Sequence, residues 1–179
     1  MTHRLFFGIK PPRPIRAALL DIMQEVDNAR WQDDGQLHLT LRYIGEVDAH
    51  TADDIAEAAT KLDFDPFELT IASTGIFERK STPTTLWAGV APSPGLTRLQ
   101  AKIERLCQRC GIPAETRKFT PHITLARLNS SAGPVGPFLA RHAGLHLGPW
   151  QVEDYILYES TLRQQGSLYE PIVTYCART

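Results

Sequence analysis

The hydrophobic residues of this chain follow two different periods, and the two alternate along the sequence. Apolar residues at helical spacing predict helices over residues 14–30, 52–62 and 96–110. Short apolar or alternating runs predict strands over residues 4–9, 37–44, 67–77, 85–90, 122–128, 150–162 and 168–177. Several strands follow one another with no helix between them. This order favours an α+β fold with antiparallel sheets over a doubly wound parallel sheet.

Gly, Pro and charged residues mark the ends of these elements. Gly45 is expected to end the strand over 37–44, and Gly111 is expected to cap the third helix. Residues 130–137 hold two Gly and two Pro and predict a loop. A charged loop is expected over residues 78–83. No low-complexity segment or linker divides the chain, so we expect one domain over residues 1–179.

Composition narrows the class of protein. The 179 residues are 42% hydrophobic and 22% charged, which is ordinary for a globular protein and excludes a disordered tail. The net charge of −1 excludes coating of duplex DNA by bulk charge. No apolar run is long enough for a membrane span, and the N-terminal residues do not resemble a signal peptide. The three cysteines argue against a disulfide framework, so we expect a cytoplasmic protein with no membrane partner.

One short pattern occurs twice. The two copies read His-Leu-Thr-Leu from His38 and His-Ile-Thr-Leu from His122, and both lie in predicted strands. Residues two apart share one face of a strand, so each copy presents an imidazole beside the hydroxyl of Thr40 or Thr124. Burying four such groups requires a partner for each of them. We therefore expect both faces to line one cleft.

These residue types suit phosphoryl chemistry. Because the pKa of histidine lies near neutrality, a pair can supply one base and one acid. Two threonine hydroxyls can donate to phosphate oxygens that gain charge in the transition state. A single His-X-Thr triplet arises often by strand alternation alone, but two copies with matched apolar residues favour a functional site. No further His or Cys stands at a spacing that completes a zinc site, so no metal or cofactor is expected.

The pair resembles the two His-X-Thr-X motifs of the 2H phosphoesterase superfamily. More of the chain is similar to the bacterial RNA 2′,3′-cyclic phosphodiesterases, also called 2′-5′ RNA ligases. The supporting pieces are Arg4–Phe7 with Pro11-Pro12, Leu37–Gly45, Phe119–Arg127, and Tyr158–Ser160 with Gly166 and Tyr169. The resemblance implies a two-lobed, pseudo-symmetric fold in which antiparallel sheets are flanked by helices. Each lobe would give one His-Thr pair to a central cleft.

The resemblance also implies a mechanism. Water would attack a 2′,3′-cyclic phosphate on an RNA end or a nucleoside, leaving a 2′-phosphate. His122 would be the general base and His38 the general acid, while Thr40 and Thr124 would hold the phosphate; the pseudo-symmetry leaves the two histidine roles open to exchange. The reverse reaction would be a weak 2′-5′ ligation. A second reading keeps the site but changes the substrate, to ADP-ribose cyclic phosphate or a 2′-5′ linked nucleotide. A third is a module that binds RNA ends without turnover.

Two more positions are candidates for nucleotide binding by resemblance. Tyr43 follows His38 by five residues, and Arg127 follows His122 by five. The odd offset should turn both side chains away from the histidines, so only a bulge would bring them back. The alternatives are a core position for Tyr43 and a surface ion pair for Arg127. Arg42 shares the parity of His38 and is expected at the RNA backbone or on a solvated rim.

Two expectations remain. Cys107 and Cys110 form a lone CxxC, which favours buried or half-exposed thiols over redox or metal use. Arg117 and Lys118 stand just before the second motif and could border the cleft. We expect the chain to act as a monomer.

Overall fold

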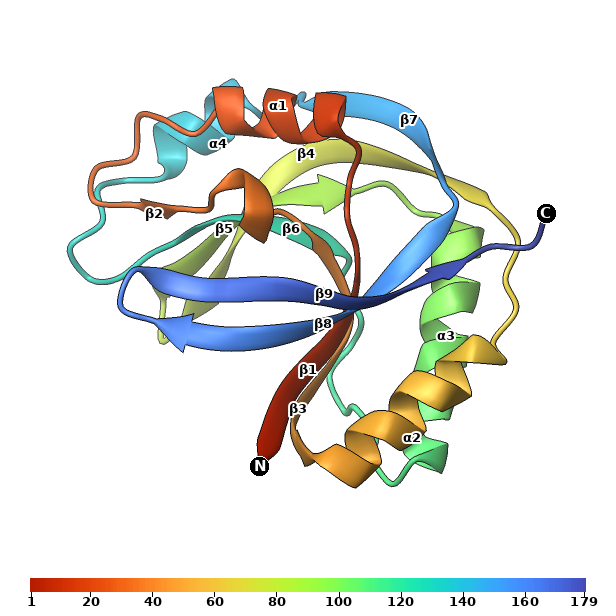
Figure 1. The fold of residues 1–179 in the computed structure, drawn as a ribbon. Helices are drawn as coiled ribbons and strands as arrows, with labels where there is room; N and C mark the ends of the chain where they lie inside the picture. The colour runs from red at the N-terminus through yellow and green to blue at the C-terminus, as the bar shows by residue number, and fades with distance from the viewer.

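The computed structural model describes residues Met1 to Thr179, in which nine strands form one antiparallel sheet (Figure 1). The elements in chain order are β1 (Thr2–Ile9), α1 (Arg13–Asp21), β2 (Arg30–Trp31), the short 3₁₀ helix η1 (Asp34–Gln36), β3 (Leu39–Asp48), α2 (Ala49–Thr60), β4 (Phe67–Arg79), β5 (Thr82–Val90), α3 (Pro94–Arg109), β6 (His122–Arg127), α4 (Gly136–Arg141), β7 (His146–Val152), β8 (Asp154–Arg163) and β9 (Gly166–Cys176). The predicted α+β class is confirmed.

The sheet consists of two halves with the same plan. Its strand order is β7-β4-β5-β6-β3-β1-β8-β9, with β2 paired to β6. We call β3, β1, β8 and β9 the first half, and β6, β5, β4 and β7 the second half. The halves meet where β3 pairs with β6, through a single antiparallel pair of Leu39 with Ile123. This seam agrees with the pseudo-symmetry that the resemblance implied.

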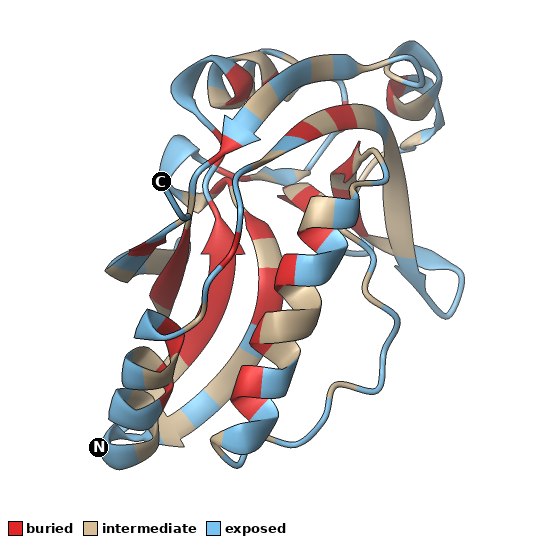
Figure 2. Cartoon of the chain, turned by 90° about the vertical axis from the view of Figure 1, so that its right-hand side faces the viewer, coloured by how far each residue is buried: buried red, intermediate tan, exposed pale blue.

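One hydrophobic core spans both halves. Thirty buried residues form a single cluster that includes Leu39 and Ile123, both fully buried. In Figure 2 the buried positions of α3 form a stripe along one side of the helix. Helices α2 and α3 pack beside β1 and β3, whereas α1 and α4 lie over the end of the sheet near β7 (Figure 1). The core therefore fixes the seam from the face opposite the histidines.

Helix α3 follows its sequence closely. The Ser93 hydroxyl accepts the Leu96 N–H at 3.2 Å, which satisfies one free donor of the first turn. Its buried residues recur at three- and four-residue spacing. Gly111 has φ +89 and follows the helix, as expected of a glycine cap. This helix also forms one side of the cleft described below.

The first predicted helix is too long. It was expected over residues 14–30, but α1 ends at Asp21. Glu25 and Asn28 have φ 71 and φ 58, a conformation that a right-handed helix cannot contain. The chain instead turns back and forms β2, which pairs with β6 beside the second motif.

Other boundaries also differ from prediction. The loop expected over 78–83 shrinks to Lys80 and Ser81, both with positive φ, because β4 and β5 continue to a tight hairpin. Part of the loop expected over 130–137 begins α4 instead. The strand expected over 150–162 is two strands, β7 and β8, separated at Glu153. Gly45 does not end β3 but lies within it at φ 90.

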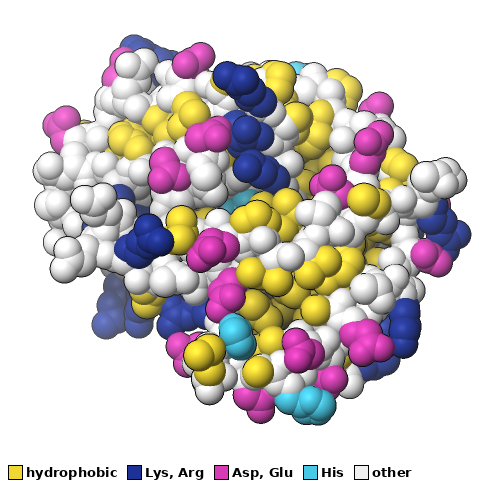
Figure 3. Space-filling model, in the orientation of Figure 1, with side chains coloured by type: hydrophobic (Ala, Val, Ile, Leu, Met, Phe, Trp, Pro, Cys, Tyr) yellow, Lys and Arg dark blue, Asp and Glu magenta, His cyan; other side chains and the backbone are white.

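Charge is dispersed over the surface. On the face seen in Figure 3, Lys and Arg side chains lie among Asp and Glu, in keeping with the net charge of −1. No helix has the length and apolar character needed to cross a membrane. The three cysteines are free.

Candidate active site

The seam brings the two motifs side by side. Because Leu39 pairs with Ile123 in antiparallel register, His38 lies level with Thr124 and Thr40 lies level with His122. The two apolar residues point into the core, so the four polar residues occupy the other face of the sheet. The structure therefore places both predicted His-Thr pairs together.

Each histidine is oriented by the backbone carbonyl two residues earlier. His38 Nδ1 lies 2.8 Å from the Gln36 carbonyl oxygen, and His122 Nδ1 lies 2.7 Å from that of Thr120. A carbonyl oxygen only accepts hydrogen bonds, so Nδ1 carries the proton in both rings. The Nε2 atom of each neutral ring is then unprotonated and can accept a proton. In the first half, His38 Nε2 is 2.9 Å from Thr40 Oγ1.

Both histidines favour the neutral form. Burial, with smaller contributions from the charges of Arg127 and His122, lowers the pKa of His38 to about 4. Burial also lowers the pKa of His122, with a further contribution from Arg127. The hydrogen bonds to the Gln36 and Thr120 carbonyls act in the opposite direction, but the effect of burial is larger.

Aromatic rings account for this burial. The Phe6 ring lies 4.7 Å from that of His38, and the Tyr169 ring lies 5.0 Å from it, edge-on. In the second half, Phe77 stands edge-on to His122 at 4.8 Å and Trp87 lies 6.2 Å away. The imidazoles are thus held in apolar walls and present one edge to the open face.

A bulge falls on the last residue of each motif. In β3, Leu41 is the extra residue between the pairs Phe7–Arg42 and Gly8–Thr40. In β6, Leu125 is the extra residue between the pairs Leu86–Ala126 and Trp87–Thr124. A bulge reverses the facing of the residues beyond it. Two consecutive residues of each strand are therefore buried, namely Leu41 with Arg42 and Leu125 with Ala126.

The bulges change the positions of the nucleotide-binding candidates. Tyr43 is 48% exposed and lines the cleft, so the alternative of a core position is wrong. Arg127 is exposed and has no carboxylate partner within 4 Å, so the alternative of a surface ion pair is also wrong. One of its nitrogens lies 3.4 Å from Thr85 Oγ1. Arg42 was expected at the RNA backbone or on a solvated rim. It is only 6% exposed and pairs with Glu104 in the lining of the cleft, so the solvated rim is wrong.

A cleft of about 700 Å³ opens beside the seam. Thr40 and His122 line it, together with Gln100 and Glu104 of α3 and residues of the segment before β6. His38, Thr124 and Arg127 lie outside its lining, so only one residue of each His-Thr pair lines this cleft, and the expectation that both pairs line it in full is wrong. The expected position of Arg117 and Lys118 at its border is confirmed.

Sequence reasoning missed the residues that hold the site. Gln36 anchors His38 and also donates from Nε2 to the Ser167 carbonyl at 2.9 Å, which ties η1 to β9. Asp33 and Gln36 form a capping box, a sequence pattern that was there to be found. The pairing of Arg42 with Glu104 had no such signal.

Neither the CxxC nor the acidic residues form a second reactive centre. Cys107 is buried, which raises the pKa of its thiol to about 12. Cys110 is half-buried, so the expectation of buried or half-exposed thiols holds. No group of three or more His, Cys, Asp or Glu side chains is arranged to hold a metal ion.

Solved structures share this fold over the whole chain. The structure of TT0787 from Thermus thermophilus matches with a TM-score of 0.82 and 26% identity over 98% of both chains. Escherichia coli LigT complexed with 3′-AMP matches with a TM-score of 0.81 and 25% identity over 100% of both. The fold and the paired motifs thus define a two-histidine phosphoesterase.

Sequence comparison narrows this class. The chain belongs to the 2′-5′ RNA ligase superfamily, whose family model matches residues 11–159. The RNA 2′,3′-cyclic phosphodiesterase of Aeropyrum pernix is 33% identical over 78% of this chain and 81% of that protein. The protein of the same name from Thermus thermophilus is 33% identical over 98% of this chain and 90% of that protein. The predicted family is confirmed.

Proposed function

We propose that this protein hydrolyses the 2′,3′-cyclic phosphate at RNA ends, or on nucleosides, to a 2′-phosphate. The observation that carries the proposal is the level placement of two His-Thr pairs across one seam, with Nδ1 of each ring fixed on a carbonyl. The names of the matched relatives support the substrate class. A module that only binds RNA would not need two oriented bases.

In this mechanism His122 Nε2 takes a proton from water, and the water oxygen attacks phosphorus. The bond from phosphorus to the 3′ oxygen breaks in line, on the opposite side. Protonated His38 gives its Nε2 proton to that oxygen, which leaves as a hydroxyl. The Thr40 and Thr124 hydroxyls donate to the non-bridging oxygens, where negative charge develops.

The acid must acquire its proton together with the substrate. Because the pKa of both histidines is lowered in the free protein, both are neutral near pH 7. A phosphate anion in the cleft favours the charged form of an adjacent imidazole and raises its pKa. The group that acts as acid therefore has a higher pKa in the substrate complex, reported by kcat, than in the free enzyme, reported by kcat/KM.

The remaining assignments follow from the same site. Tyr43 would stack on the nucleoside and Arg127 would contact it as a cation. Attack by an RNA hydroxyl in reverse would give weak 2′-5′ ligation. We place the protein in the cytoplasm as a monomer, supported by its three free cysteines and by the presence of both His-Thr pairs in one chain.

The decisive experiment uses an RNA labelled at its terminal 2′,3′-cyclic phosphate, with EDTA present. We expect conversion to the 2′-phosphate, resolved from the 3′-phosphate by chromatography. The His50→Ala variant is the matched control, because that histidine is exposed on α2. Formation of the 3′-phosphate would show that the 2′ oxygen leaves, and the proposed choice of leaving oxygen would be wrong. No conversion by a folded sample would overturn the proposal.

A further inference from the structure

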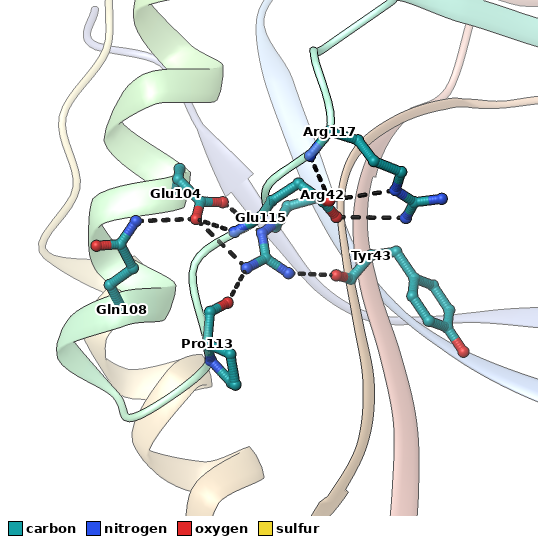
Figure 4. Close-up of polar contacts among 7 residues, drawn as sticks. All are labelled: Arg42, Tyr43, Glu104, Gln108, Pro113, Glu115 and Arg117. Atoms are coloured by element: carbon teal, nitrogen blue, oxygen red, sulfur yellow. Dashed lines mark hydrogen bonds and ion pairs between the residues drawn. The ribbon is translucent and has the colours of Figure 1, made fainter.

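A largely buried ion pair forms part of the wall of the cleft. Arg42 donates from Nε to Glu104 and from its other nitrogens to the carbonyls of Tyr43 and Pro113, each at 2.6 Å (Figure 4). The guanidinium lowers the pKa of Glu104 to about 2, so the pair is charged at any working pH. Arg42 thus joins three parts of the chain, namely β3, α3 and the α3–β6 linker (residues 110–121).

The linker depends on this pair for its position. Residues 113–120 take part in none of the backbone–backbone hydrogen bonds of turns and loops. Side chains hold the linker instead. Glu104 accepts the Glu115 N–H at 3.0 Å, and Glu115 accepts the Arg117 N–H at 3.0 Å (Figure 4). The position of the linker along the cleft therefore depends on the contacts that begin at the Arg42–Glu104 pair.

The wall that results has the chemistry of a strand-binding surface. Arg117 and Lys118 line the cleft together with Glu78. Arg117 pairs with Glu115 at 3.2 Å, whereas Lys118 has no carboxylate partner within 4 Å. The exposed ring of Tyr43 lies on the same cleft. Cations beside an aromatic ring are the features with which proteins hold a single nucleic-acid strand, by its phosphates and its bases. Thr40 and His122, which would serve the cyclic phosphate, lie elsewhere on the lining.

The other half of the molecule shows that this pair is not required by the fold. Ala126 occupies the position equivalent to Arg42, four residues after its histidine and directly after the bulge. The same backbone is formed there around a methyl group. Arg42 and Glu104 therefore have a role that is specific to the first half and that the shared backbone plan does not require.

We propose that Arg42 and Glu104 are positioning residues for a second subsite, formed by Arg117 and Lys118 on the same cleft as the Tyr43 ring, that takes the RNA strand preceding the cyclic phosphate. This inference rests on the proposed function. It makes the enzyme selective for RNA ends over cyclic mononucleotides.

The test compares kcat and KM for uridine 2′,3′-cyclic phosphate and for an RNA octamer that ends in the same group. We expect Glu104→Gln to raise KM for the octamer about fivefold to tenfold, with a much smaller change for the mononucleotide. Lys118→Gln should raise the octamer KM about threefold and reduce the salt slope of log(kcat/KM) by about 0.7. Arg141→Met, which removes an exposed ion pair on α4, is the matched control.

The outcomes separate the inference from the proposed function. Equal changes for both substrates, or a shared loss of kcat, would show that Glu104 is merely structural and would overturn the inference. If Glu104→Gln does not fold, Lys118→Gln still tests the strand subsite, because its side chain is on the surface, and an unchanged octamer KM in that variant would overturn the inference. Wild-type protein that converts neither substrate would overturn the proposed function. Fluorescence anisotropy with the octamer carrying a 2′-phosphate would then still show whether Lys118→Gln weakens strand binding.

Discussion

The two halves of the molecule share a backbone plan and differ in what fills equivalent positions. In each half a histidine is anchored two residues upstream, is followed by threonine two residues later, and precedes a bulge. Beyond the bulge Arg42 faces the core in one half and Ala126 does so in the other. The next residue, Tyr43 or Arg127, faces outward. The backbone of the two halves is thus symmetric, but the side chains at equivalent positions differ. The two sides of the site therefore present different chemical groups to a substrate.

The largest effect on activity is expected when one of the two histidines is removed at a time. We expect His38→Ala and His122→Ala each to lower kcat by at least ~10², the low end for general acid–base catalysis. Rapid-quench assays on cyclic-phosphate RNA would measure this, with His50→Ala as control. Near-normal turnover by either variant would remove that residue from the mechanism.

A sulfur leaving atom sharpens the assignment of roles. A thiolate leaves without protonation, so a substrate with sulfur at the 3′ bridging position should restore turnover to the variant that lacks the acid. We expect rescue of His38→Ala and not of His122→Ala. The opposite pattern would exchange the two roles, which pseudo-symmetry alone would allow.

The threonines come next in size. A hydrogen bond to a charged group contributes about 1.5–3 kcal/mol, so Thr40→Val and Thr124→Val should each lower kcat/KM roughly tenfold to a hundredfold. Thr40→Val also frees His38 Nε2 and should shift its pH profile more than Thr124→Val does. Circular dichroism and the exposed control Thr60→Val would test for a structural effect. Loss of fold in either variant would make that threonine structural.

Stability should depend on pH through the first half in particular. The pKa of His38 is about 4 when folded and near 6.5 when unfolded, so the unfolded chain binds more protons between these values. Stability should therefore fall as pH drops from 6.5 to 4. We expect His38→Gln to remove on the order of 1–2 kcal/mol of that loss. Urea denaturation at pH 4.5 and 7 would measure it, and an unchanged pH dependence would contradict it.

The smallest effects on activity are expected at Tyr43 and Arg127, and the pKa of the histidines distinguishes the two residues. Arg127→Met and Tyr43→Leu should each raise KM severalfold, through about 0.5–2 kcal/mol of lost cation–π contact or stacking. Only Arg127→Met should raise the pKa of both histidines, because its charge lowers them. Imidazole titration by NMR would show this, with Arg178→Met as the control. An equal shift in both variants would contradict it.

The sequence predicted the helices and strands whose apolar residues recur at a regular spacing. The alternation around His38 and His122 identified the two strands of the seam, and helical spacing identified α3. The bulges at Leu41 and Leu125 were not predictable, because one extra residue changes no composition and shows only in the pairing. For this reason the facing of Tyr43 was left open.

Short elements and distant pairings were also out of reach. Helix α4 is six residues long, begins with Gly136 and Pro137, and follows Gly133 and Pro134, and such residues are typical of a loop. Arg42 and Glu104 lie 62 positions apart, and neither residue carries a local signal for the other. Their pairing follows from the fold, which brings α3 against β3.

The seam has a further consequence for how such a molecule could be built. An antiparallel pair of equivalent strands, related by a two-fold axis through Leu39 and Ile123, is the contact that two identical chains make in an isologous dimer. Neither half alone holds both an acid and a base. A chain of half this length would therefore assemble the same set of four side chains only by dimerising through its edge strand. Joining the halves in one chain leaves each free to change without the other.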